Sequence, residues 1–235
     1  MSTAFLFVHG IQGHPRQFRF LTDRLPEGTP YRNLLLLGHG ADVKAFRRSG
    51  REAWLAAVHE AARELRGQCD RLVFVGHSMG CLLGLLTEQA APGTFSEMLL
   101  LCCPFRIRPT YGYLRNNLLA SRPAKPTDDP FVQAAREANG VTAAYPAQYL
   151  TCAHPYLELL RLMREVRKDC APPACRITFV FSEKDEIVSP RSMRYARERF
   201  GAEPVILLGC GHNWFSEEGK EKIGHKVKLM IEEVL

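Results

Sequence analysis

A chain of 235 residues with 46% hydrophobic and 24% charged residues has the composition of a folded globular protein, which excludes a disordered or fibrous chain. The formal net charge of +6 is modest and no run of five basic residues occurs, so nucleic-acid binding is not expected. The N-terminal sequence does not read as a signal peptide and no apolar stretch reaches about 18 residues, so we expect a soluble, cytoplasmic protein without stable membrane insertion.

Apolar runs alternate with helical patterns along the chain. The runs are continuous rather than alternating, which is typical of a parallel sheet covered on both faces. The pattern therefore predicts an α/β fold with a mostly parallel, doubly wound sheet of about six strands. The expected strands are 3–9, 33–38, 71–76, 97–103, 175–182 and 204–209, and the expected helices are 49–67, 79–90, 189–201 and 217–235.

Residues 104–173 interrupt this alternation. The segment is helix-like, contains several prolines and is too long to be a structureless loop inside a compact domain. We expect a core formed by 1–103 and 174–235, with 104–173 inserted as a helical cap over the site. At the start of the helix expected at 49–67, Ser49 and Glu52 have the spacing of a capping box.

The eight cysteines include no Cys-x-x-Cys pair, and their spacings match no zinc template. We therefore expect reduced thiols and no metal site. Cys81, Cys102 and Cys103 lie in apolar runs and are expected to pack as small core residues.

Ser78 lies between Gly76 and Gly80 in the sequence VGHSMGC, directly after an expected strand and before an expected helix. This is the context of a nucleophile elbow, in which a strained turn lifts the serine oxygen above the sheet. Side chains two residues on either side of Ser78 would collide with neighbouring backbone, which explains the glycines. The following helix begins at the same point, where its N-terminus favours negative charge.

An oxyanion intermediate needs two backbone N–H donors. The sequence His9-Gly10-Ile11-Gln12-Gly13 follows the first strand, and Gly10 would let this loop approach Ser78 closely. We predict that the donors are the N–H groups of Ile11 and Met79, with His9 shaping the loop. A purely structural turn at 9–13 is the alternative.

A serine nucleophile also needs a base, and His212 in LLGCGHNWF directly follows the last expected strand. His77 is adjacent to Ser78 and is expected to point away from it. His39 in GHGAD is a plausible neighbour of the site, but it comes too early in the chain order to be the base. The other histidines are expected to be surface or packing residues.

The acid that orients the base should follow the fifth strand, where FVFSEKDEIVSP offers three carboxylates. Asp185 is best placed, because the residues after it keep it in a loop and Val188 can anchor the turn. Glu183 and Glu186 are expected to face solvent.

Taken in order, HGIQG, GHG, GHSMG, SEKDEIV and GCGH resemble the α/β-hydrolase superfamily, in particular compact bacterial carboxylesterases and monoacylglycerol lipases. Ser78, Asp185 and His212 follow the chain order expected of that fold. The resemblance implies a serine hydrolase that cleaves short- to medium-chain acyl esters or monoacylglycerol-like lipids without a cofactor. A thioesterase or amidase with the same triad, and a non-catalytic binding protein, are the alternatives. The full fold has eight strands, and the first two are not readable here.

The expected cap would line the acyl pocket, although packing of the cap onto the sheet is expected to account for most of its apolar residues. Its arginines could also attract an anionic substrate, with plain solvated surface as the alternative. The apolar candidates are Phe105, Tyr111, Tyr113, Leu114, Leu118, Leu119, Tyr145, Tyr149, Tyr156 and Leu160, and the basic ones are Arg106, Arg108, Arg115, Arg122 and Lys125.

Overall fold

The computed structural model describes residues 2–144 and 146–232. Within them, six parallel strands form one sheet in the order β2-β1-β3-β4-β5-β6, which confirms the expected parallel sheet. Val8 at the end of β1 pairs with Gly76 near the end of β3, so the loops after these two strands lie side by side. The strands are β1 (Thr3–Val8), β2 (Tyr31–Leu34), β3 (Arg71–His77), β4 (Glu97–Leu101), β5 (Arg176–Ser182) and β6 (Val205–Leu207).

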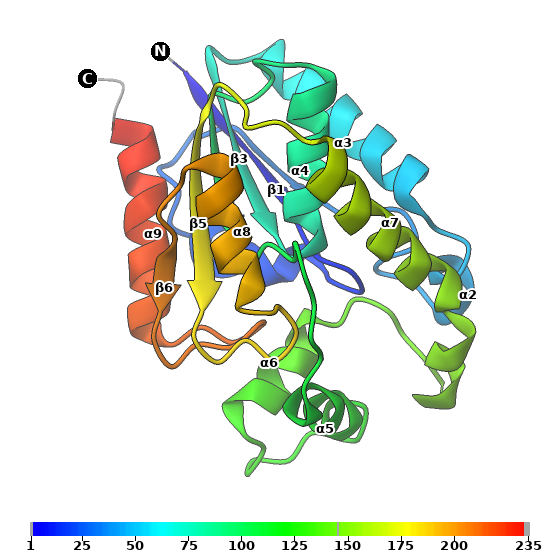
Figure 1. Ribbon diagram of the computed structural model, residues 1–235. Coiled ribbons are helices and arrows are strands. Elements are labelled where there is room, and N and C mark those ends of the chain that lie inside the picture. The colour runs from blue at the N-terminus through cyan, green and yellow to red at the C-terminus, as the bar shows by residue number, and fades with distance from the viewer. Residues whose placement is uncertain (1, 145, 233–235) are drawn as a thin grey trace.

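Helices cover both sides of the sheet, as the continuous apolar strands require. The long helices α3 (Arg51–Arg66), α4 (Met79–Ala90) and α7 (Ala153–Asp169) pack together on one side, and α9 (Glu217–Glu232) lies on the other, next to the short α1 (Arg19–Thr22) (Figure 1). The remaining core elements are η1 (Pro15–Phe18), α2 (Val43–Phe46) and α8 (Arg191–Phe200).

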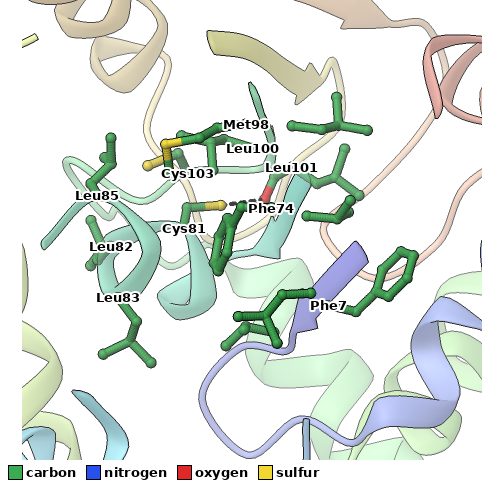
Figure 2. Packing of buried hydrophobic residues seen from close by; sticks show 14 of the residues in the cluster. Phe7, Phe74, Cys81, Leu82, Leu83, Leu85, Met98, Leu100, Leu101 and Cys103 are labelled. Atoms are coloured by element: carbon green, nitrogen blue, oxygen red, sulfur yellow. Dashed lines mark hydrogen bonds between the residues drawn. The ribbon is translucent and has the colours of Figure 1, made fainter. Parts of the chain in front are cut away.

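The main core includes the layer between the sheet and α4. Phe74, Leu82 and Leu83 are fully buried there (Figure 2). Cys81 and Cys103 are also fully buried among them, in agreement with the expectation that they pack as small core residues. All eight cysteines lie in the described residues and are unpaired.

The segment expected as a cap divides into two parts. Helices α5 (Tyr111–Ala120) and α6 (Pro130–Ala138) pack against each other beyond the carboxyl ends of the strands, followed by η2 (Pro146–Thr151) (Figure 1). In contrast, α7 places Leu162, Met163 and Val166 in the main core. By its packing α7 therefore belongs to the core, and the cap that we propose ends near residue 152 instead of 173.

Two local expectations are wrong. The strand expected at 33–38 ends at Leu34, and the next residues leave the sheet with Leu35 and Leu37 exposed. The capping box does not form, because α3 begins after Gly50 without a side-chain cap. Ser49 is instead buried in the preceding turn, where its hydroxyl donates to the carbonyl of Phe46 at 2.8 Å.

No helix among the described residues is long and apolar enough to cross a membrane. The expected final helix runs to 235, but its last residues, 233–235, lie outside the described residues.

Candidate active site

Ser78 occupies a sharp turn between β3 and α4. Its backbone has φ 51° and ψ −121°, a conformation that non-glycine residues rarely adopt outside functional sites. A Cβ on Gly76 would lie 2.8 Å from the amide nitrogen of Cys81, and one on Gly80 only 2.0 Å from the carbonyl oxygen of Val8. The two glycines therefore let the turn pack against α4 and β1, which is the reason expected from the sequence.

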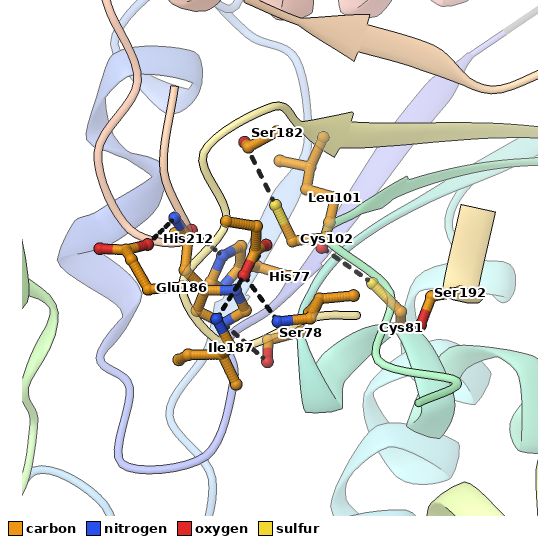
Figure 3. Close-up of polar contacts among 12 residues, drawn as sticks. His77, Ser78, Cys81, Leu101, Cys102, Ser182, Glu186, Ile187, Ser192 and His212 are labelled. Carbon is orange, nitrogen blue, oxygen red and sulfur yellow. Dashed lines mark hydrogen bonds and ion pairs between the residues drawn. The ribbon is translucent and has the colours of Figure 1, made fainter. Parts of the chain in front are cut away.

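The structure brings Ser78, His212 and Asp185 together from three loops at the carboxyl edge of the sheet. Figure 3 shows Ser78 and His212. The Ser78 hydroxyl lies 3.1 Å from Nε2 of His212, and Nδ1 of His212 lies 2.9 Å from one carboxylate oxygen of Asp185. Because Nδ1–H donates to the carboxylate, Nε2 is free to accept the serine proton. The arrangement can therefore transfer a proton from Ser78 to His212.

Asp185 is held by its own loop. One of its carboxylate oxygens accepts the N–H groups of Ile187 at 2.9 Å and Val188 at 2.7 Å. Burial disfavours the charged carboxylate, but His212 and these hydrogen bonds outweigh burial and lower the pKa of Asp185. Asp185 therefore remains ionised at neutral pH.

His212 is only 5% exposed, and burial alone would lower its pKa. The charge of Asp185, the hydrogen bond to it and the charge of Glu186 outweigh burial, and the pKa of His212 lies above its ordinary value. The site thus stabilises the imidazolium that would form when Ser78 loses its proton.

The loop after β1 approaches Ser78 closely. A Cβ on Gly10 would lie 2.8 Å from Cβ of Ser78. The loop forms a turn in which the N–H of Gly13 donates to the carbonyl of Gly10 at 3.0 Å. At its centre, the N–H of Gln12 donates to Nε2 of His39 at 3.1 Å, so this donor is already used. The Ile11 N–H remains as the loop's candidate oxyanion donor.

Two buried histidines fix this loop. His9 donates through Nδ1 to the carbonyl of Gly10 at 2.9 Å and accepts the N–H of Leu36 through Nε2 at 3.2 Å. Burial lowers the pKa of His9 well below its ordinary value and that of His39 to about 4, so both rings remain neutral acceptors at neutral pH. His39 is thus a neighbour of the site, as its sequence context suggested, and its role there is structural.

On the other side of Ser78, Met79 is the first residue of α4. A residue at this position has no intrahelical acceptor for its N–H. Met79 and Ile11 thus stay the two candidate N–H donors for an oxyanion next to Ser78.

The two glutamates expected to face solvent both bind the loop that carries His212, and only Glu183 is also exposed as expected. Glu186 is half-buried, and its carboxylate accepts the N–H of His212 at 2.8 Å. Glu183 is exposed, but its carboxylate accepts the N–H of Gly209 at 2.8 Å. The sequence offered no signal for these contacts, because they join residues 26 positions apart.

A cavity of about 320 Å³ opens beside Ser78 and His212. The cap contributes Tyr113, Asn117 and Ala138 to its wall, and α7 contributes Tyr156 and Leu159. Most of the lining is apolar, which suits a small acyl group.

Of the ten apolar candidates for this pocket, two line it: Tyr113 and Tyr156. Phe105 packs in the main core, Tyr149 belongs to a small cluster with Cys152, and Leu119 is half-buried away from the cavity. Tyr145 lies outside the described residues. Those at the surface are Tyr111, Leu114, Leu118 and Leu160. Among the described residues, none of the five basic candidates lines the cavity.

His77, Cys102 and His212 could together hold a metal ion, since their ligand atoms lie within 4.8 Å of one another. Both His212 nitrogens already contact Ser78 and Asp185. Burial, followed by the charge of Asp185, raises the pKa of the Cys102 thiol well above its ordinary value, whereas a metal requires the thiolate. We therefore assign no metal to these residues.

Solved structures of several hydrolases share this fold. One, from a study of LipS and LipT, two metagenome-derived lipolytic enzymes, is 21% identical with a TM-score of 0.73, covering 98% of this chain and 94% of that one. A Paleococcus ferrophilus monoacylglycerol lipase is 14% identical with a TM-score of 0.67, covering 95% and 91%. The N-acyl homoserine lactonase AidH, complexed with N-butanoyl homoserine, is 14% identical with a TM-score of 0.63, covering 98% and 89%.

At these identities the likeness concerns the fold. No protein among the curated sequences compared with the chain matches it. The model of the alpha/beta hydrolase family, however, matches residues 5–223, which is nearly the whole chain. The chain belongs to the alpha/beta hydrolase family.

Proposed function

We propose that this protein is a serine hydrolase that cleaves carboxylic esters of short- to medium-chain acids, or monoacylglycerol-like lipids, through an acyl-enzyme. The observation that carries the proposal is the contact of 3.1 Å between the Ser78 hydroxyl and Nε2 of His212, whose other nitrogen is bound by Asp185. This is the arrangement of a nucleophile, a base and an orienting acid.

The reaction would proceed in two steps. His212 takes the proton of Ser78 as the serine oxygen bonds to the acyl carbon, and the Ile11 and Met79 N–H groups stabilise the oxyanion. The bond to the leaving alcohol then breaks, and His212 returns the proton to the alcohol oxygen. Water attacks the acyl-enzyme with His212 again as base, which releases the acid and restores Ser78. None of these steps requires a metal or organic cofactor.

The cavity supports a small substrate. A volume of about 320 Å³ is at the lower end of ligand sites, and its apolar wall fits a short acyl chain better than a long one. The same three residues would also serve a thioesterase or amidase. A binding protein without activity is disfavoured, because each of the three side chains is present and in contact.

The test compares a p-nitrophenyl ester, a thioester and an anilide of one acyl chain. We expect the ester to have the highest kcat/KM, and Ser78→Ala to lower its kcat by about 10⁴–10⁶ and to abolish fluorophosphonate labelling. A preference for the thioester or anilide would favour the alternative enzymes. A loss below about tenfold in Ser78→Ala would exclude Ser78 as the nucleophile.

A chain-length series of p-nitrophenyl esters would test the pocket. Tyr113→Ala enlarges the cavity, so the variant should prefer esters with longer acyl chains than the wild type does. Each methylene that the larger cavity accommodates should stabilise the transition state by about 1–3 kcal/mol. Tyr111→Ala is the matched control on the same helix, since Tyr111 is 80% exposed and lies outside the cavity lining. An equal response of both variants would show that α5 does not select the acyl chain.

A further inference from the structure

The peptide groups on both sides of His212 are held by side chains. Glu186 accepts the N–H of His212 at 2.8 Å, and Nε2–H of His77 donates to the carbonyl of His212 at 2.9 Å (Figure 3). Neither contact involves the imidazole of His212, which is left for Ser78 and Asp185. The backbone of the proposed base is therefore bound separately from its ring.

Glu186 is itself firmly placed. Its carbonyl accepts the N–H of Thr110 at 2.9 Å, and the carbonyl of Ile187 accepts the N–H of Arg108 at 2.8 Å. Asn116 of the cap helix α5 is 7% exposed, and its Nδ2 donates to the second carboxylate oxygen of Glu186 at 3.4 Å. The chain entering the cap and the loop of Asp185 thus fix the carboxylate that binds His212.

His77, the residue before Ser78, binds the carbonyl group of His212. Its ring is buried, its centroid lies 4.9 Å from that of His212, and the residue is bonded directly to Ser78. Nδ1 of His77 has no hydrogen-bond partner among the described residues, so Nε2–H is its one polar contact there. Burial, followed by the proximity of His212, lowers the pKa of His77 to about 3 and leaves the ring neutral.

We propose that Glu186 and His77 are positioning residues that clamp the backbone of His212, so that its ring stays aligned between Ser78 and Asp185. The proposal rests on the hydrolase function proposed above. Because a misplacement of about 1 Å can lower a rate about 100-fold, two side chains that fix this backbone would matter for turnover without touching substrate.

The two residues should differ in their electrostatic effect. The charges that act on His212 come from Asp185 and Glu186. The other two titratable groups next to His212 are neutral: the pKa of the His77 ring on β3 is lowered, and the pKa of the Cys102 thiol after β4 is raised. Losing the Glu186 charge should therefore lower the pKa of His212, and losing His77 should leave that pKa unchanged.

Three variants separate these effects in pH profiles of p-nitrophenyl butyrate hydrolysis. Glu186→Gln keeps an oxygen acceptor but loses the charge, so kcat should stay within about threefold while the acid limb moves to lower pH. Glu186→Ala should move the limb in the same direction and lower kcat about tenfold or more. His77→Phe should lower kcat by a similar factor without moving the limb. KM should change little in all three.

Glu183→Gln is the matched control, because it removes a carboxylate of the same loop that binds Gly209 instead of His212. The acid limb of the pH profile of Glu183→Gln should lie at the same pH as that of the wild type. A kcat within about twofold of wild type in both Glu186→Ala and His77→Phe would overturn the clamp, as would an unmoved limb in Glu186→Gln. Thermal unfolding of each variant, with assays well below its transition, separates misfolding from misplacement.

NMR titration of His212 in histidine-labelled protein provides a test without turnover. We expect one sharp ring resonance in wild type, a lower titration midpoint in Glu186→Gln, and a broadened or doubled resonance in Glu186→Ala. An unchanged midpoint and lineshape would refute the clamp even if the protein hydrolyses no ester. Conversely, a wild-type protein whose Ser78 resists fluorophosphonate refutes the proposed function and leaves this readout valid.

Discussion

Replacing Gly80 with alanine should damage both stability and activity. The added Cβ would lie 2.0 Å from the carbonyl oxygen of Val8, where even a close carbon–oxygen contact needs about 3.3 Å, so β1 and α4 must separate by roughly 1 Å. Overpacking of this kind costs about 1–3 kcal/mol, which exceeds the gain of roughly 0.5–1 kcal/mol from alanine in a helix. We expect a lower free energy of unfolding.

The same displacement would move Ser78 away from the Ile11 loop, because Val8 leads directly into that loop. A shift of about 1 Å should lower kcat about 100-fold, measured with p-nitrophenyl butyrate below the unfolding transition. Gly84→Ala is the control: its Cβ would meet the Phe74 ring at 2.2 Å, one turn further along α4. That variant should lose stability and keep its kcat. A Gly80→Ala protein with wild-type kcat would refute the claim that this contact positions the serine.

Three further predictions concern charge. Because the pKa of His212 is raised and the base must be neutral, kcat/KM should fall with decreasing pH through a midpoint above about 6.5. A midpoint below that value would show that burial of His212 outweighs the charges of Asp185 and Glu186. Asp185→Asn should lower kcat by about 10⁴ while Glu183→Gln has a far smaller effect, and the reverse result would identify a different acid. Neutralising Arg106, Arg108 and Arg115 together should change KM equally for neutral and anionic esters, since none lines the cavity, and a selective rise for anionic esters would show that they recruit substrate.

Local sequence rules were sufficient for the elbow. The geometry of the turn at Ser78 depends on residues two positions away, and both glycines are visible in the sequence. The parallel sheet could also be predicted from the sequence, because a strand that is buried on both faces has a continuous apolar run. Features that depend only on near neighbours and on strand burial could thus be predicted.

The limits of the cap could not be read in this way. An amphipathic helix shows the same periodicity whether its apolar face packs on a sheet or on a lid, so α7 gave no sign that Leu162 and Met163 lie in the main core. Which aromatic residues of the cap line the cavity could not be predicted from the sequence either. Tyr111 and Tyr113 are two positions apart on α5, and because such residues point in different directions, one is exposed and the other lines the cavity.

The three carboxylates of the loop after β5 show where such rules end. Asp185 has a short side chain that accepts the N–H two residues later, as aspartates in turns commonly do, and this contact leaves the carboxylate facing His212. That choice rests on local chemistry and could be made from the sequence. Glu186 has the longer reach, and its partner is the backbone of a residue on a different strand's loop. Any residue with an N–H could have been that partner, so only the folded chain identifies it.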